Sequence, residues 1–324
     1  MQIVHHSLTN GSGLHRVAES LAKAETALGL DSVLADSQNP ATWGPAVTAD
    51  VHVVHSHLPP ILTRRRDSRV VWVGHGTPEH CFQGSVEEAE RGQYGHSDPA
   101  MLALHWLKTA DARVTFWERH KWIYDQMLSR GARPVDLVPM GVDTAFWKEG
   151  TSAGAYAGSP SLLYAENPHY IKWAYDLLTA LPTIQARHPG LMLHSIYQVK
   201  DHHRVVMPWF HQLGASFFTH YSAQVFDKPN LRNAFRSCDF VLGLVRYGDL
   251  NHLSLEANAA GVKTISYVGN PHAMYWVKEG DQREIAREVS AILAGEVEPR
   301  VQVPVPNVSE TAVAMKAIYE EIAG

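Results

Sequence analysis

The sequence predicts an α/β protein built from two doubly wound, parallel-sheet domains. Short apolar runs typical of buried strands alternate with amphipathic helical segments through both halves of the chain. With 324 residues, 45% of them hydrophobic, the chain is long enough to bury two cores. The run TSAGAYAGSP at 151–160 has the small-residue composition of a linker. We therefore expect one domain at residues 1–150 and a second at 151–324.

The first half alternates strand and helix from its first residues. A helix at 14–28 carries its apolar residues on one stripe and ends before Gly29. The loop Gly11, Ser12 and Gly13 precedes this helix, and such a loop can expose backbone amides to an anion or a sugar. It is equally consistent with an ordinary βα turn. Further strands are predicted at 2–6, 32–35, 50–57, 69–76 and 112–116, and further helices at 101–109 and 118–129.

The second half repeats this pattern. Its central segment, 231–266, is predicted to form a helix, a buried strand, a polar loop, a second helix that ends at Gly261, and a further strand. In such a βαβ unit, ligands bind where strand ends meet helix N-termini. Other strands are predicted at 161–165, 191–197 and 217–218, and other helices at 171–188, 283–293 and 308–322.

Glu256 is an unexpected residue on the second helix of that segment. It shares a face with Leu253, Ala257 and Ala260, so its carboxylate lies on the stripe that should pack inward. Burying a carboxylate is costly unless a partner bonds to it, and a ligand with hydroxyl groups would serve. The alternative is a glutamate at the edge of the stripe, solvated or favoured by the helix dipole.

Composition excludes several classes of protein. A net charge of -5 gives no general attraction to nucleic acid or to anionic membranes. The chain shows no signal peptide and no apolar run of 18 residues, so a cytoplasmic protein without a membrane span is expected. Cys81 and Cys238 are far apart and adjoin apolar residues, as reduced core thiols do. The 20 histidines do not follow the spacing of a metal site.

Several segments together resemble the GT-B glycosyltransferases, specifically the large retaining family called glycosyl transferases group 1, or family 4-like. The run CDFVLGLVRYGDLNHLSLEANAAGVKTIS at 238–266 is similar to that family's donor-binding segment. DVHVVHSH at 50–57 and RVVWVGHG at 69–76 are similar to two of its strands, and PVDLVPMGVDTAF at 134–146 to its crossing into the second domain. The resemblance implies two Rossmann-like domains facing a cleft. In that architecture the last helix, here about 308–324, often packs back on the first domain.

The resemblance implies a donor site in the second domain. Glu256 would hold the ribose hydroxyls of a nucleoside diphosphate sugar, for which a UDP-sugar is the expected donor. Lys172, placed where the family has a lysine, would contact the diphosphate. Backbone amides of the loop before the helix would face the sugar and phosphates of the donor. These loop residues are Asp249, Leu250, Asn251 and His252.

The resemblance places the reacting centre between that loop and the first domain. His75 would lie at the sugar end of the donor, although a histidine at a strand end is otherwise more often a hydrogen-bonded edge residue. His75 and Asp249 are therefore the catalytic candidates. The acceptor would approach Gly11, Ser12 and Gly13, and Gly13 would also border the donor. The family needs no bound metal or permanent cofactor, so none is expected here.

Two positions depart from the family pattern. The first acidic residue of its E-x7-E pair falls on Gly248, with Asp249 one position later. Either Asp249 has taken over that role or the donor sugar is held differently. An arginine that contacts the diphosphate in the family is replaced by Glu166, and His169 or Arg246 could supply the missing positive charge.

The implied function is transfer of a sugar to an acceptor hydroxyl with retention of anomeric configuration. The acceptor is open: a glycan, a small molecule, or a hydroxymethylated DNA base as in compact phage enzymes. For DNA, the cluster at 64–69 and the pair Arg130 and Arg133 could contact phosphates, although such residues are more often solvated. The same two-domain shape could also belong to a sugar-nucleotide 2-epimerase, or to a sensor that binds a nucleotide sugar without catalysis.

Overall fold

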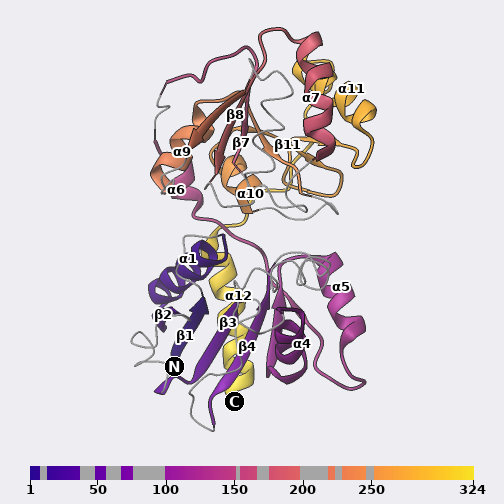
Figure 1. Cartoon of the computed structure of the whole chain (residues 1–324). Coiled ribbons are helices and arrows are strands. Elements are labelled where there is room, and N and C mark those ends of the chain that lie inside the picture. Colours follow the sequence, from indigo (N-terminus) through magenta and orange to yellow (C-terminus); the bar gives the residue numbers. More distant parts are fainter. Residues whose placement is uncertain are drawn as a thin grey trace. The chain divides into compact units, whose positions relative to one another are not determined.

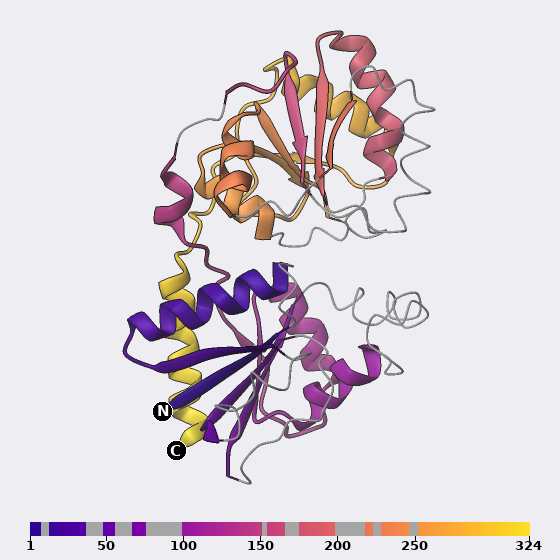
Figure 2. The same ribbon diagram turned by 60° about the vertical axis from the view of Figure 1, so that its left-hand side comes forward.

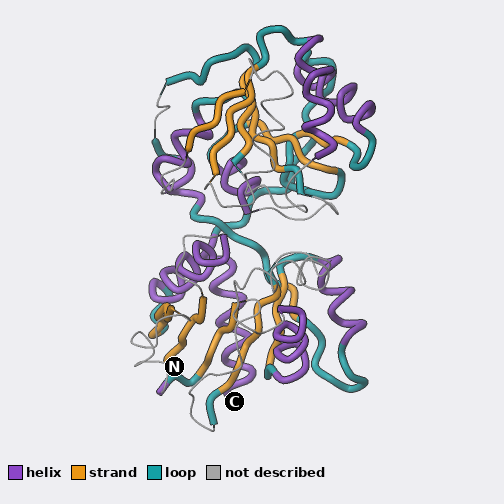
Figure 3. The backbone as a smooth tube through the Cα atoms, in the orientation of Figure 1, coloured by secondary structure: helices purple, strands orange, loops and turns teal. Residues whose placement is uncertain are grey.

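The computed structural model describes residues 1–7, 13–36, 48–55, 67–75, 99–150, 154–165, 175–197, 218–222, 228–245 and 252–324. These residues form two compact units: unit 1 consists of 1–143 with 306–324, and unit 2 of 144–305. In each unit the strands form one parallel sheet that lies among helices (Figure 3). The predicted class, α/β with two parallel sheets, is confirmed.

Unit 1 contains a six-stranded sheet in the order β2-β1-β3-β4-β5-β6, with every neighbouring pair parallel. The order changes direction between β1 and β3, and ligands of doubly wound sheets bind at such a switch point, beyond the carboxyl ends of the strands. The elements, shown in Figure 1, are β1 (Gln2–Ser7), α1 (Gly13–Ala27), β2 (Asp31–Asp36), β3 (Val51–His55), β4 (Arg69–Gly74), α4 (Pro99–Thr109), β5 (Ala112–Thr115), α5 (Glu118–Met127), β6 (Asp136–Leu137) and α12 (Val308–Ala323).

Successive residues of each strand in unit 1 face two different helix layers, because side chains alternate across a sheet. Val53 belongs to the cluster that includes Leu21 of α1 and Met315 of α12. Trp72 belongs to the cluster on the other face, with Trp106 of α4. Figure 2 shows α12 and α4 on opposite sides of the sheet. Full burial of one such aliphatic side chain contributes about 1.5–3 kcal/mol, so both faces favour apolar strands.

Aspartates that directly precede strands tie neighbouring strands together at their amino ends. Asp50, before β3, accepts the Gln2 backbone N–H at 2.8 Å. Asp111, before β5, does the same for the β4 backbone at 2.8 Å. In unit 2 the carboxylate of Asp239 accepts from the backbone N–H of Ser161 at 2.8 Å and from its hydroxyl at 2.9 Å. These bonds satisfy amides that the ladder leaves unpaired at strand starts.

Unit 2 also contains a six-stranded parallel sheet, in the order β12-β11-β10-β7-β8-β9. This is the Rossmann order, and its switch point lies between β7 and β10. The elements are α6 (Thr144–Lys148), β7 (Ser161–Tyr164), α7 (Tyr175–Arg187), β8 (Met192–Tyr197), β9 (Phe218–Ser222), α9 (Lys228–Arg236), β10 (Phe240–Gly243), α10 (His252–Ala259), β11 (Lys263–Tyr267), β12 (Tyr275–Val277) and α11 (Gln282–Leu293).

The main core of unit 2 lies between its sheet and the helices α7 and α11. Leu181 and Ile184 of α7 and Val289 of α11 are fully buried and join Leu242 of β10 in one cluster. Helix α11 begins at a strong cap, because the Asp281 side chain accepts backbone N–H groups of the first turn. The sheet and the two helices therefore form a rigid support for the loops at its carboxyl edge.

The segment predicted as a linker is part of unit 2. The Tyr156 N–H donates to the carbonyl of Ser237 at 2.6 Å, and the Tyr156 ring stacks on His194 with centroids 4.7 Å apart. Gly154 and Gly158 have φ of 110° and 111°. The small residues at 154–160 thus provide left-handed turns rather than a flexible connection, and composition alone does not separate these two uses. Residues 151–153 lie outside the described part.

Candidate functional site

Five buried histidines lie on three adjacent strands of unit 1, around its switch point. His5 and His6 belong to β1, His52 and His55 to β3, and His75 directly follows β4. His5, His55 and His75 lie on the same face of the sheet as the apolar residues that pack against α1 and α12. A polar layer therefore continues the apolar core toward the carboxyl edge of the sheet.

The three histidines of this layer form a continuous hydrogen-bonded chain. His5 Nδ1 lies 3.0 Å from His55 Nε2, and His55 Nδ1 lies 2.7 Å from His75 Nε2. The chain ends inside the protein at Glu25 of α1, whose Oε2 lies 2.7 Å from His5 Nε2. Burial lowers the pKa of His55 well below its usual value, and the neighbouring imidazoles of His75 and His5 lower it further. His55 is therefore neutral at neutral pH.

Glu25 is fully buried and accepts hydrogen bonds from two hydroxyl groups besides His5. Ser32 Oγ donates to Oε2 at 2.7 Å, and Tyr319 Oη of α12 donates to Oε1 at 2.8 Å. Burial raises the Tyr319 pKa well above its usual value, and the adjacent Glu25 carboxylate raises it further. The hydroxyl therefore keeps its proton and remains a donor. Three donors together offset part of the cost of burying this carboxylate.

A second histidine pair lies on the opposite face of the same strands. His6 Nε2 is 3.1 Å from His52 Nδ1, and the two rings stack with centroids 5.3 Å apart. Burial is the main reason that the pKa of His6 falls to about 3, with smaller contributions from His52 and His5. His6 is therefore neutral at neutral pH.

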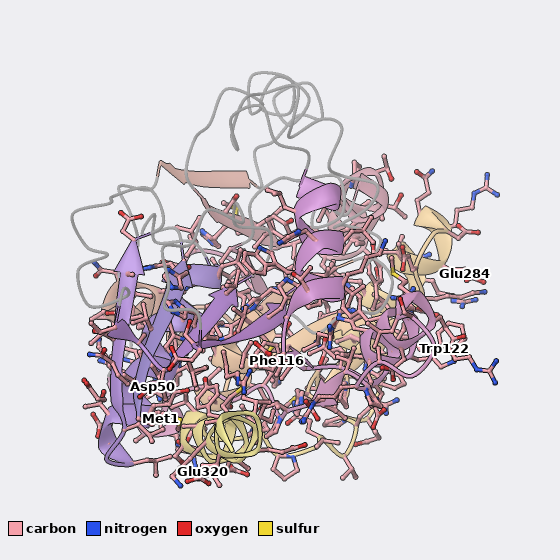
Figure 4. All side chains as sticks on the ribbon, turned by 90° about the horizontal axis from the view of Figure 1, so that it is seen from below. Met1, Asp50, Phe116, Trp122, Glu284 and Glu320 are labelled. Carbon is pink, nitrogen blue, oxygen red and sulfur yellow. The ribbon has the colours of Figure 1, made fainter. Side chains whose placement is uncertain are left out.

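His75 is the member of the histidine chain that is nearest the carboxyl edge of the sheet. It is 7% exposed, and its ring centroid lies 5.4 Å from that of Phe116, which follows β5 and is labelled in Figure 4. Gly13 is the first residue of α1, and a Cβ added there would meet no atom within 4 Å among the residues that the structure describes. His75 and Gly13 are thus at the end of unit 1 where ligands of such sheets bind. Gly11 and Ser12 lie outside the described residues.

In unit 2 the predicted donor-site glutamate lies on α10, the helix that follows β10. Glu256 is 0% exposed, and its Oε1 lies 3.1 Å from Nδ1 of His252, the first residue of the helix. The alternative of a solvated glutamate at the stripe edge is therefore wrong. The predicted single inward stripe is also wrong, because Ser254 and Leu255 are fully buried as well. A short helix enclosed by its neighbours has no solvent face to impose periodicity.

Much of the predicted donor loop falls on residues that the structure does not describe. Asp249, Leu250, Asn251 and Lys172 all lie outside the described residues, as does Gly248. Of the four predicted loop residues, His252 is described, at the start of α10. The predicted residues with described positions are Glu256 and His252 in unit 2 and, in unit 1 taken by itself, His75 and Gly13.

No family model and no curated protein matches this sequence. Among solved structures, the sucrose-phosphate synthase (tll1590) of Thermosynechococcus elongatus is similar over 100% of this chain and 96% of its own, with 14% identity and a TM-score of 0.70. Anabaena Alr3699/HepE, solved in complex with UDP and glucose, is similar over 100% and 98%, with 13% identity and a TM-score of 0.63. WaaG, a glycosyltransferase involved in lipopolysaccharide biosynthesis, is similar over 99% and 98%, with 13% identity and a TM-score of 0.66. This chain has the GT-B fold.

The GT-B fold explains why polar residues gather at the carboxyl edges of both sheets, since those edges carry the ligands of doubly wound folds.

In unit 2, sequence reasoning missed a cluster of hydrogen-bonded polar residues after β11. Asn270 is fully buried, its Oδ1 accepts the His272 N–H at 3.1 Å, and its carbonyl accepts the Trp276 indole N–H at 2.7 Å. Ser266 Oγ donates to the Gly243 carbonyl of β10 at 2.7 Å. The cluster fixes the loop after β11 beside β10.

In unit 1, sequence reasoning singled out His75 but missed Glu25, His5 and His55 behind it. A signal was present in the sequence. Histidines recur at alternate positions of neighbouring apolar strands, where valine or isoleucine would be expected. Glu25 gave a second signal, because it lies four residues after Leu21 on the apolar stripe of α1.

Two further expectations concern cysteine and metal chemistry. Within the described ranges, no group of three or more His, Cys, Asp or Glu side chains could hold a metal ion. Cys238 is a free, half-buried thiol whose pKa is raised, mainly by burial and also by Asp239, whereas Cys81 lies outside the described residues. Among the helices described, none combines the length and the apolar character that crossing a membrane requires.

Proposed function

We propose that this GT-B protein is a glycosyltransferase that moves a sugar from a nucleoside diphosphate sugar to an acceptor hydroxyl with retention. The observation that carries the proposal is Glu256, a fully buried carboxylate on the helix that follows β10. This helix adjoins the switch point of a Rossmann-order sheet, where nucleotides bind. Similar structures in complex with UDP and with UDP-glucose support a uridine nucleotide as the donor.

The carboxylate of Glu256 suits the ribose of the donor. An ionised carboxyl group has only acceptor sites, and its two oxygens can accept from two adjacent hydroxyl groups at once. Nδ1 of His252 lies 3.1 Å from Oε1, on one side of the carboxylate. The start of α10 directs backbone amides toward the preceding loop, so the diphosphate would lie there, with Lys172 supplying positive charge. In this arrangement lysine and amides stabilise the leaving diphosphate, and no step needs a metal ion.

Residues of unit 1 have proposed roles as well. His75 would contact hydroxyl groups of the transferred sugar, and Asp249 would take the part of the acidic residue that Gly248 replaces. The acceptor would enter beside Gly11, Ser12 and Gly13, and a Cβ added at Gly13 would meet no atom of the described residues within 4 Å. Positioning the acceptor hydroxyl against the anomeric carbon is then the main catalytic task.

A glycan or small-molecule acceptor is better supported than DNA. Arg133, one of the arginines that could contact phosphates, is paired with Glu321 and, at 3.0 Å, with Asp136. Arg69 donates to the Ile322 carbonyl at 2.9 Å. Both guanidinium groups are thus engaged within unit 1, and a phosphate would have to compete with these partners.

Thermal unfolding with and without UDP-glucose tests the donor site. A ligand that binds the native state at about 100 times its Kd stabilises it by about 2.7 kcal/mol. We expect Glu256→Gln, which keeps the shape but loses an acceptor oxygen, to weaken binding roughly 10- to 100-fold. Glu298→Gln, at an exposed position of the same unit, is the matched control and should bind like the wild type. Equal donor affinity in Glu256→Gln and the wild type would refute the assignment.

Product analysis separates the candidate functions. A glycosyltransferase releases UDP from the donor in proportion to an added acceptor, and the anomeric configuration of the product reports retention. A 2-epimerase would isomerise the sugar of the donor without any acceptor. A sensor would bind the donor without turnover, and retention on duplex DNA that weakens with salt would favour a DNA acceptor.

A further inference from the structure

The histidine chain of unit 1 connects a buried carboxylate to the predicted ligand end of the sheet through three imidazoles. Glu25 Oε2 contacts Nε2 of His5, and each later link joins Nδ1 of one ring to Nε2 of the next, from His5 through His55 to His75. A neutral imidazole has one N–H donor and one acceptor nitrogen. A chain with this repeating connection therefore has two possible directions, and whatever fixes the first ring fixes all of them.

The carboxylate at the inner end sets the donor-to-acceptor direction of the hydrogen bonds along the chain. The Glu25 carboxylate can only accept, and Ser32 and Tyr319 already donate to it. Nε2 of His5 must then carry a proton, and in a neutral His5 ring Nδ1 accepts one from Nε2 of His55. By the same step Nδ1 of His55 accepts from Nε2 of His75. The other nitrogen of the last ring, Nδ1 of His75, is then an acceptor.

We propose that Glu25 is a positioning residue that, through His5 and His55, holds His75 in the Nε2–H tautomer with Nδ1 as an acceptor for a ligand hydroxyl. The ligand class rests on the proposed function, since a sugar hydroxyl is the donor that His75 would meet there. The tautomer itself rests only on the hydrogen-bond chain. Without Glu25, His75 could equally present an N–H to the ligand, which would donate to the hydroxyl oxygen instead of accepting its hydrogen.

The surroundings of the chain support a function beyond packing. The groups that face it are Glu25 of α1, Ser32 of β2 and Tyr319 of α12, with His6 on the other face of β1. Apolar residues fill the equivalent positions one layer deeper, at Ile3 and Val53. Replacing a buried polar network by apolar side chains of similar volume is often neutral or stabilising, so stability alone does not account for this one.

Nitrogen NMR of the protein labelled with ¹⁵N in its imidazole rings tests the proposal without any ligand. Two-bond correlation spectra distinguish the Nε2–H tautomer, the Nδ1–H tautomer and the imidazolium ion. Single His→Gln substitutions assign His5, His55 and His75. We expect all three rings to be Nε2–H tautomers at neutral pH. An Nδ1–H tautomer or an imidazolium at any of the three would overturn the proposal.

Glu25→Gln tests whether the carboxylate is the cause. A carboxamide can donate as well as accept, so we expect the His75 signals to change from one tautomer to a mixture. Tyr319→Phe is the matched control, because it removes one donor to Glu25 but keeps the carboxylate, and His75 should remain Nε2–H.

His55→Phe breaks the chain with Glu25 intact and should also produce a mixture at His75, even if Glu25→Gln does not fold. An unchanged His75 spectrum in a folded Glu25→Gln or His55→Phe protein would refute the positioning role. Failure of the donor-binding test at Glu256 would leave these spectra unaffected, so the two proposals fail separately.

Discussion

Acid should destabilise the protein through two histidines that are neutral when folded. The pKa of His6 falls to about 3, mainly because the ring is buried, and the pKa of His55 is lowered well below its usual value for the same main reason. Both rings regain their ordinary pKa, about 6.5, on unfolding. Below that pH the unfolded chain binds protons that the folded protein does not. The stability contributed by the neutral rings is thus present above about pH 6.5 and is lost as the pH falls toward the folded-state value.

The size of the effect follows from proton linkage. Between about pH 7.5 and pH 5.5, a histidine that titrates only in the unfolded state costs about 1.4 kcal/mol of unfolding free energy. His6, whose pKa falls to about 3, therefore costs about 1.4 kcal/mol over that range, and His55 adds a loss of the same sign. A loss of this size is a large fraction of the 5–15 kcal/mol typical of domain stability.

Urea unfolding at several pH values measures the loss. His6→Gln removes one of the two titrating groups, so the decrease in stability from about pH 7.5 to pH 5.5 should shrink by about 1.4 kcal/mol. His105→Gln, at an exposed position on α4, is the control and should leave the decrease unchanged. Comparing slopes with pH rather than absolute stabilities cancels any packing defect of the variant. The reasoning is refuted if His6→Gln and the wild type lose the same stability.

Two substitutions test the packing of unit 1. Gly141→Ala should destabilise it by several kcal/mol, roughly the cost of an overpacked core, because the new methyl would lie 2.3 Å from the Asn307 carbonyl oxygen. Gly13→Ala, whose new methyl meets no described atom within 4 Å, should not destabilise it, and thermal melts compare the two variants. Asp50→Ala should cost about 1–3 kcal/mol in urea unfolding, because it leaves the Gln2 N–H without its carboxylate acceptor. Asp50→Asn keeps an acceptor oxygen and should recover most of that loss, and equal losses in the two variants would exclude this role for the carboxylate.

Local sequence patterns account for most elements of both units. The predicted helix at 14–28 is α1 at Gly13–Ala27, and the predicted helix at 308–322 is α12 at Val308–Ala323. The apolar residues of these helices recur with a clear helical period, and the helix ends carry specific signals. These are the Asn307 capping box of α12 and the positive φ of Gly29 after α1. The short strand β12, Tyr275–Val277, was not predicted, because three residues give no period to read.

Contacts between distant parts of the chain account for what the sequence did not predict. The bond between Glu25 and Tyr319 joins residues 294 positions apart, and no local pattern pairs them. Glu256 is buried, which is one of the two alternatives that its place on the helix left open, while its part in donor binding stays a prediction. Periodicity can indicate that a polar residue faces inward, but it does not reveal which donors surround it.

The donors around each buried carboxylate suggest different uses for Glu25 and Glu256. Glu25 accepts from three protein donors that come from β1, β2 and α12, so few of its acceptor sites remain, and it lies at the inner end of the histidine chain. It can influence a ligand only through the rings between them. Glu256 lies one turn into α10, directly after the loop that follows β10, with His252 on one side. A carboxylate in that position can bond a ligand itself, so loss of Glu256 should reduce donor affinity, whereas loss of Glu25 should change what His75 offers to the ligand.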